Sequence, residues 1–166
     1  MASDSSLPGK PRILIIGVGN ADRGDDAMGL LVARRLQETI GNSATIREMG
    51  GEGAALIDAW SEAQTVILID AVQGGAEPGS VYRFDARTHP IPAMFSRSST
   101  HTFGIAEAIG LARALHCLPS QLIVYGIEGK NFALGARLSP TVERAAEDIV
   151  QRVQQEVLAW SAAAGG

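Results

Sequence analysis

Residues 13–32 read ILIIGVGNADRGDDAMGLLV, and this stretch decides the fold. It begins with a short β-branched run, typical of a buried strand, and passes within a few residues into an amphipathic helix. The turn between them carries two adjacent carboxylates, Asp25 and Asp26, at the start of the helix. A turn that binds phosphate offers backbone N–H groups to the anion, and carboxylates there would repel it. We therefore expect a polar or metal-binding edge at this turn.

Three familiar motifs are absent from the sequence. The dinucleotide fingerprint needs a glycine three places after Gly19, but that position holds Asp22. The sequence has neither a phosphate-loop lysine motif nor the Gly-x-Ser-x-Gly elbow of serine hydrolases. A nucleoside- or phosphate-handling enzyme is therefore a disfavoured alternative.

The composition narrows the class of protein. With 166 residues, of which 46% are hydrophobic, the chain fits one domain with a sizeable core. A formal net charge of −4 argues against nucleic acid as a partner. The single Cys117 forms no internal disulfide, and the polar residues before the first apolar run resemble neither a signal peptide nor a membrane span. We expect a cytoplasmic monomer with no membrane partner.

Strand-like runs alternate with helical patterns along the chain, which is typical of a mostly parallel sheet covered on both faces. The predicted strands lie at 12–17, 44–48, 65–70, 81–85 and 121–127. The predicted helices lie at 28–40, 53–61 and 102–115, and the last begins at Ser139-Pro140. The connection at 74–79 is too short for a crossover helix, so the strand after it is expected to run antiparallel. The sequence thus predicts one three-layer α/β domain over 12–160, with a twisted, mostly parallel sheet of about five strands flanked by helices on both faces, a flexible tail at 1–11 and a frayed tail at 161–166.

Three side chains are predicted to meet at one edge of this sheet. Asp70 ends the third strand, and the turn that holds Asp25 and Asp26 leaves the first strand at the same edge, where ligands of open α/β sheets bind. His101 follows an irregular segment at 86–100 and precedes a helix, whose dipole favours the neutral imidazole that binds metal. Two carboxylates and one imidazole leave coordination positions for water or a substrate group. Taken singly, each of these residues is explained as readily by a capping role as by metal binding. The prediction of a metal site therefore depends on the side chains lying close together at one edge.

Other polar residues have simpler interpretations. His89 and His116 are expected to be structural, and Cys117 is expected to be a small core or surface thiol. Glu52 and Glu128 follow the second and fifth strands, and for Glu128 a solvated loop acid is the favoured interpretation.

The chain resembles the nickel-iron hydrogenase maturation endopeptidase family from about residue 12 to 157. The resemblance depends on four motifs: GVGN at 17–20 followed by GDD at 24–26, LIDA at 68–71, STHTFGIA at 99–106 and LSP at 138–140. It implies that Asp26, Asp70 and His101 are the metal-contacting and catalytic residues, and it leaves Asp25 as a cap. Many members have Glu in place of Asp26 and Asp in place of Met49.

The resemblance also implies a function. Such proteins remove a C-terminal extension from a hydrogenase large-subunit precursor after nickel insertion, and the nickel is carried by the precursor. The metal could polarise the scissile carbonyl or lower the pKa of a bound water, and Asp25 or Glu128 could act as general base. The alternative is a non-enzymatic nickel-binding delivery or sensing module, which would not need the peptide groove that residues 86–100 could form.

Overall fold

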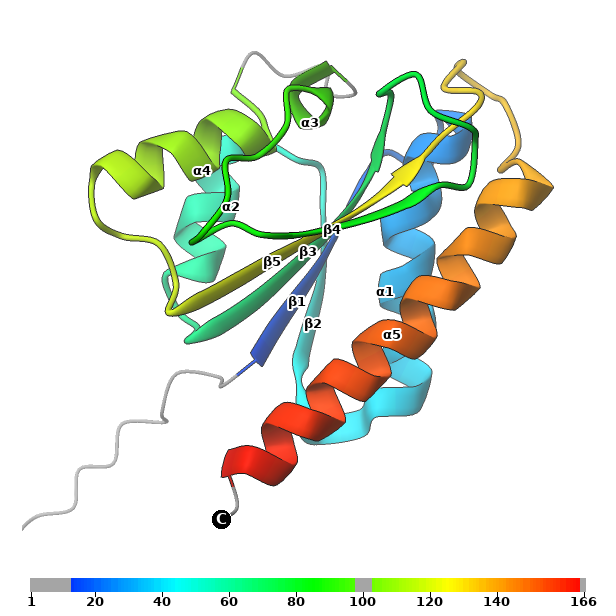
Figure 1. Cartoon of the computed structure of the whole chain (residues 1–166). Coiled ribbons are helices and arrows are strands. Elements are labelled where there is room, and N and C mark those ends of the chain that lie inside the picture. Colours follow the sequence, from blue (N-terminus) through cyan, green and yellow to red (C-terminus); the bar gives the residue numbers. More distant parts are fainter. Residues whose placement is uncertain (1–12, 98–102, 165–166) are drawn as a thin grey trace, which may run out of the picture.

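The computed structural model describes residues 13–97 and 103–164, and Figure 1 shows a twisted sheet between two layers of helices. In the described part of the chain the strands are β1 (Ile13–Val18), β2 (Thr45–Met49), β3 (Thr65–Val72), β4 (Val81–Asp85) and β5 (Gln121–Glu128). They form one sheet in the order β2-β1-β3-β5-β4. Only β4 is antiparallel to its neighbour among these strands, as its short connection predicts. The predicted fold class is confirmed.

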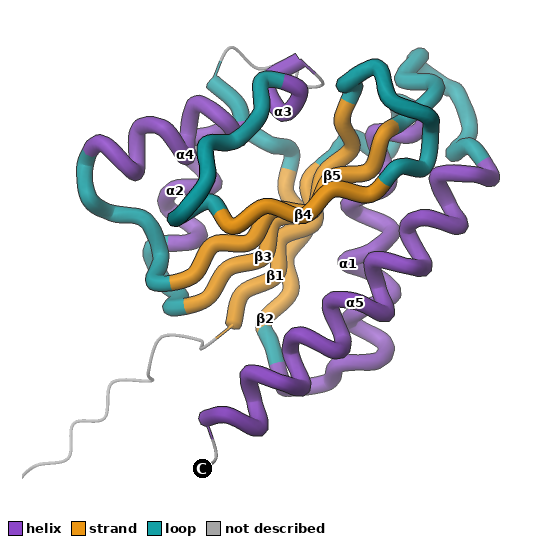
Figure 2. Tube along the Cα trace, in the orientation of Figure 1, coloured by secondary structure: helices purple, strands orange, loops and turns teal. Residues whose placement is uncertain are grey.

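The helices cover both faces of the sheet (Figure 2). One face packs against α1 (Met28–Ile40) and α5 (Pro140–Ala164). The other packs against α2 (Gly53–Trp60), α3 (Met94–Arg97) and α4 (Ile105–Ala114). Two 3-10 turns, η1 (Gly24–Ala27) and η2 (Gly41–Ser43), flank α1. Gly41 has a φ of 63°, so it ends α1 in a conformation that glycine adopts without strain.

The core consists of two hydrophobic layers, one on each face of the sheet. Side chains alternate along a strand, so Ile67 and Ile69 of β3 belong to the layer under α1 and α5. Leu68 lies in the layer under α2 and α4. Because both faces are buried, the central strands are continuously apolar rather than alternating.

Helix α1 lies directly on the sheet because glycines occur at the contact. A Cβ atom added at Gly29 would lie 2.3 Å from the carbonyl oxygen of Val18 and 2.4 Å from that of Ile69. A Cβ added at Gly17 would lie 2.2 Å from the Gly29 oxygen. This close approach fixes the position of the turn that precedes α1.

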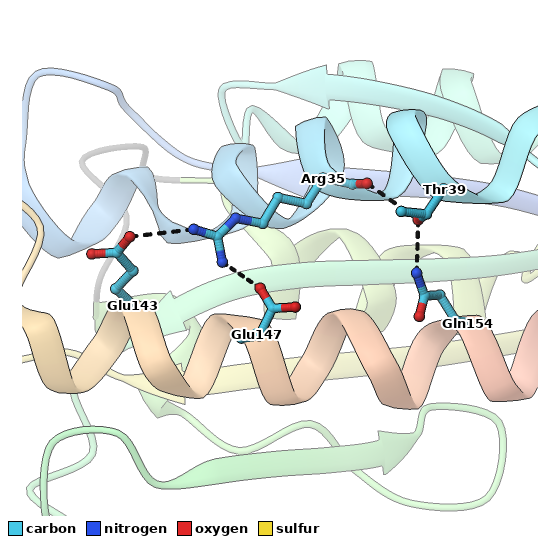
Figure 3. Close-up of polar contacts among 5 residues, drawn as sticks. All are labelled: Arg35, Thr39, Glu143, Glu147 and Gln154. Carbon is cyan, nitrogen blue, oxygen red and sulfur yellow. Dashed lines mark hydrogen bonds and ion pairs between the residues drawn. The ribbon is translucent and has the colours of Figure 1, made fainter.

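Polar contacts join the outer surfaces of α1 and α5 (Figure 3). Arg35 forms ion pairs with Glu143 and Glu147, and the Gln154 amide donates a 2.7 Å hydrogen bond to the Thr39 hydroxyl. Both glutamates are exposed and Arg35 is partly exposed, so each ion pair contributes only about 0–1 kcal/mol. The apolar layer beneath them supplies most of the attraction between the helices and the sheet.

Helix α5 extends beyond residue 160, where the predicted domain ends. Residues 161–164, predicted to fray, continue α5 as far as Ala164. Alanine has the highest helix propensity, and the preceding Trp160 packs against the core, which holds the last turns in place. No helix in the described residues is long and apolar enough to cross a membrane. The predicted tail at 1–11 and residues 165–166 lie outside the described residues.

The segment predicted to be irregular at 86–100 contains the short helix α3. Phe95 is fully buried, and its ring meets the Phe84 ring edge-on at a centroid distance of 5.9 Å. A single apolar anchor leaves no periodic pattern, which explains why the sequence did not predict this helix. Residues 98–102, including the predicted start of the third helix, lie outside the described residues.

Candidate functional site

Asp70 lies at the carboxyl end of the parallel strands. It precedes the last two residues of β3, pairs with Gly126 of β5, and is 5% exposed. Gly17 of β1 pairs with Ile69, so the turn after β1 begins beside Asp70. The structure therefore brings Asp70 and the acidic turn to one edge of the sheet, as predicted.

The electrostatics of Asp70 link it to Asp26. Burial raises the pKa of Asp70 well above its usual range, and the negative charge of Asp26 raises it further. A hydrogen bond from the Ala71 backbone N–H opposes these effects only in part. The two carboxylates are thus close enough to act on one another in a water-poor site, which is an arrangement that a bound cation would relieve.

His101 lies outside the described residues, so its predicted place beside Asp26 and Asp70 stays a prediction. The described chain resumes at Phe103, whose carbonyl accepts a 2.8 Å hydrogen bond from the Gly53 N–H at the start of α2. Helix α2 follows β2, so Phe103 lies toward the same edge of the sheet as Asp70. Among the described residues, no three His, Cys, Asp or Glu side chains are grouped to hold a metal, and that search does not include His101.

Asp25 does not cap the helix that it precedes, so this prediction was wrong. The side chain is fully buried and accepts hydrogen bonds from segments more than 100 residues away. The backbone N–H groups of Lys130 and Asn131 donate to Oδ2 at 2.7 and 2.9 Å. The Ser139 N–H donates to Oδ1 at 2.7 Å, and the Ser139 hydroxyl donates to Oδ2 at 2.8 Å. Asp25 therefore ties the first turn to the connection between β5 and α5.

Backbone contacts strengthen this tie. The Asp25 N–H donates to the Asn131 carbonyl at 2.9 Å, and the Gly135 N–H donates to the Asp22 carbonyl at 2.7 Å. Gly24 has a φ of 56°, and a Cβ there would lie 2.3 Å from the Asn131 oxygen. These contacts hold the turn that carries Asp26 against the connection between β5 and α5.

The environment of Asp25 also makes it a poor general base. Burial raises the pKa of its carboxyl, but the hydrogen bonds from Ser139, Asn131 and Lys130 outweigh burial, and the net pKa is lowered. A carboxylate with a lowered pKa and occupied oxygens accepts a proton poorly. Its role is to hold the turn.

Glu128 is buried, not solvated, so the favoured interpretation of this residue was also wrong. It is 3% exposed and accepts 2.8 Å hydrogen bonds from the backbone N–H groups of Gly74 and Gly75. The Tyr82 hydroxyl lies 3.4 Å from Oε2. The two glycines lie in the connection between β3 and β4, whose position the sequence does not reveal. Like Asp25, Glu128 holds a loop at the edge of the site, and its occupied oxygens do not favour a role as base.

Glu52 has a local role. It is the N-cap of α2, and its carboxylate accepts from the Ala54 and Ala55 N–H groups, both at 3.3 Å. It satisfies donors that the first turn of any helix leaves free. Cys117 is exposed, in agreement with a surface thiol.

Comparisons with known proteins show the family. The family model described as hydrogenase maturation protease (HycI) matches residues 30–156, a span that contains Asp70 and His101 and begins after Asp26. The chain is 27% identical over 154 residues to the hydrogenase expression/formation protein HupD of Rhodobacter capsulatus, covering 90% of this chain and 72% of that protein. It is 27% identical over 146 residues to the hydrogenase 2 maturation protease of Escherichia coli, covering 86% and 88%.

The fold is also similar to that of solved structures. The solution structure of an endopeptidase from Escherichia coli has a TM-score of 0.74 and 27% identity, covering 86% of this chain and 89% of that one. These similarities favour an endopeptidase over the alternative of a non-enzymatic delivery or sensing module. The chain belongs to the hydrogenase maturation protease family and is an endopeptidase.

Proposed function

We propose that this endopeptidase removes the C-terminal extension of a nickel-iron hydrogenase large-subunit precursor after nickel insertion. Asp26, Asp70 and His101 recognise the nickel that the precursor carries, and the cut is made beside it. One observation supports this most directly. Asp70 is buried at the carboxyl edge of the sheet with the charge of Asp26 acting on it.

The donor set suits a substrate-borne metal. Carboxylate oxygens and an imidazole nitrogen accept borderline divalent ions such as nickel, and three ligands leave positions for the groups that the precursor supplies. Nickel there would polarise the scissile carbonyl or lower the pKa of a bound water. Recognition of nickel by the protease would make cutting conditional on metal insertion.

Two loops around the edge are held in place by buried carboxylates. Asp25 fixes the connection at 129–139, and Glu128 fixes the Gly74-Gly75 turn. Catalytic constellations need rigid support, since small misplacements of a reacting group lower rates strongly. We propose that this support keeps Asp26 and Asp70 in place while the precursor tail is bound.

We also propose that the protein acts in the cytoplasm as a monomer and binds no nucleic acid. Its net charge of −4 and its single cysteine support this setting.

Three variants test the proposed site. Asp26→Asn, Asp70→Asn and His101→Ala should each lower the rate at which nickel-loaded precursor is shortened by more than about 100-fold. Matched controls are Asp58→Asn, an exposed carboxylate on α2, and His89→Ala, an exposed imidazole before α3. The controls should process the precursor at the rate of the unaltered protein. Full activity of any of the three site variants would contradict the assignment of that residue.

A further inference from the structure

A basic hollow lies at the opposite end of the sheet from Asp70. Its volume is about 200 Å³, and it is lined by Arg87, Arg113, His116 and Leu118. Arg87 follows β4, whose last residue pairs with Ile123 near the start of β5. His116 and Leu118 directly precede β5. The hollow therefore belongs to the amino end of β5, away from the edge that carries the site described above.

The guanidinium groups of both arginines donate to backbone carbonyls, while the backbone N–H of Arg87 donates to the Asp85 carboxylate at 3.0 Å. The Arg87 guanidinium donates to the Pro119 carbonyl at 2.9 Å. The Arg113 guanidinium donates to the Ala86 carbonyl and, at 3.2 Å, to the His89 carbonyl. In the described part of the chain neither guanidinium forms an ion pair with a carboxylate.

The positive charges of these two guanidinium groups are therefore not neutralised by their carbonyl partners. A carbonyl fixes a guanidinium in direction but does not neutralise it, and each guanidinium has five N–H donors. The carbonyl contacts above use only part of that set. Two oriented cations thus line one hollow in a protein of net charge −4.

The backbone at His116 is unusual in the same place. Helix α4 ends in a Schellman motif, in which the His116 N–H donates to the Arg113 carbonyl and the Cys117 N–H donates to the Ala112 carbonyl. The position after the C-cap is normally glycine because its φ is positive, but here His116 has a φ of 56°. An L-residue in this conformation has a local cost, and such outliers concentrate at functional positions.

We propose that this hollow is a binding site for a small oxyanion of the phosphate class. Planar guanidinium groups bind phosphate oxygens through paired N–H donors, and the imidazole of His116, which also lines the hollow, adds a donor. The hollow is smaller than the pockets that hold whole cofactors, so it suits a single phosphate group. That group could be free phosphate or the phosphate of a small monoester.

A titration tests the proposal. Inorganic phosphate is added to the ¹⁵N-labelled protein at constant ionic strength, and backbone and arginine side-chain resonances are followed. We expect saturable shifts around the hollow, and at least tenfold weaker binding in Arg87→Gln and in Arg113→Gln. The control Arg144→Gln removes an exposed arginine of α5 that also has no acidic partner among the described residues, and it should bind phosphate normally. Absence of saturable binding, or equal weakening in the control, would overturn the proposal.

Two further ligands identify the chemistry. Glycerol phosphate that binds more tightly than inorganic phosphate would indicate an esterified ligand, and the reverse order would indicate free phosphate. Either result supports the site. Acetate that binds as tightly as phosphate would overturn the assignment to the phosphate class.

His116→Gly separates binding from folding. Glycine relieves the positive φ, so the melting temperature should rise while phosphate affinity falls. A purely structural histidine would give the first change without the second. A higher melting temperature with unchanged phosphate affinity would therefore remove His116 from the site.

Discussion

Ser139 donates both its backbone N–H and its hydroxyl to the buried carboxylate of Asp25, at 2.7 and 2.8 Å, across 114 residues of sequence. Asp25, which directly precedes the predicted metal ligand Asp26, thus joins the turn before α1 to the start of α5. These two helices pack side by side on one face of the sheet (Figure 1). The turn that carries Asp26 is therefore held in place by a contact between the N-terminal and C-terminal parts of the domain.

Replacing Asp25 by Asn should destabilise the protein by about 2–3 kcal/mol. The amide has one accepting oxygen, and its NH₂ group would face backbone donors from Lys130, Asn131 or Ser139. Urea unfolding measures the change. Ser139→Ala is the milder comparison, since it removes the hydroxyl but keeps the backbone N–H, and it should cost about 1–2 kcal/mol. Equal stability of Asp25→Asn and the unaltered protein would contradict the role of this tie.

The same tie predicts a pH dependence. The pKa of Asp25 is lowered in the folded state, so its contribution to stability is present above its unfolded pKa and is lost as the pH falls through the folded value. The unaltered protein should exceed Asp25→Asn in stability at neutral pH, and the gap should narrow below about pH 4. Unfolding curves of the two proteins between pH 3 and pH 7 check this. A gap that stays constant over this range would show that the charge of Asp25 is not involved.

Ionisation of Asp70 should lower the stability of the protein, whereas ionisation of Asp25 raises it. Its pKa is raised in the folded state, so its ionisation opposes folding once the pH exceeds about 4, the ordinary aspartate value. Asp70→Asn should therefore be at least as stable as the unaltered protein at neutral pH while losing its processing activity. Denaturant unfolding and the precursor assay measure the two effects on one sample. Strong destabilisation would mean that Asp70 serves the fold rather than the site.

Gly29→Ala tests whether α1 must touch the sheet. The added methyl group would meet the carbonyl oxygens of Val18 and Ile69, which are backbone atoms that cannot turn away. We expect a loss of about 3 kcal/mol or more in the free energy of unfolding. Gly110→Ala on α4, where a Cβ meets open space, is the control and should be neutral or slightly stabilising. Similar stability of the two variants would contradict the close packing of α1.

Local features of the fold were predictable from the sequence. The apolar spacing from Met28 to Ile40 and the glycine after it define α1 within the residues that form it. The strands are recognisable because both faces of the sheet are buried, which makes each central strand a continuous apolar run. The antiparallel direction of β4 follows from the length of one connection.

Features that depend on distant partners were not predictable. Asp25 and Glu128 resemble a helix cap and a solvated acid when only their neighbours are considered. Their partners are backbone N–H groups of loops far away in the sequence, and backbone groups carry no sequence signal. For Asp70, the strand pattern was enough to predict its position at the carboxyl edge of the sheet, because the topology determines the edge at which a parallel strand ends.

The most direct test compares nickel-loaded and nickel-free precursor. Each form of a nickel-iron hydrogenase large-subunit precursor is incubated with the purified protein, and its intact mass is followed over time. We expect the nickel-loaded form to lose one C-terminal peptide and the nickel-free form to keep its full mass. Shortening of both forms at the same rate would contradict nickel recognition, and shortening of neither would contradict the proposed substrate.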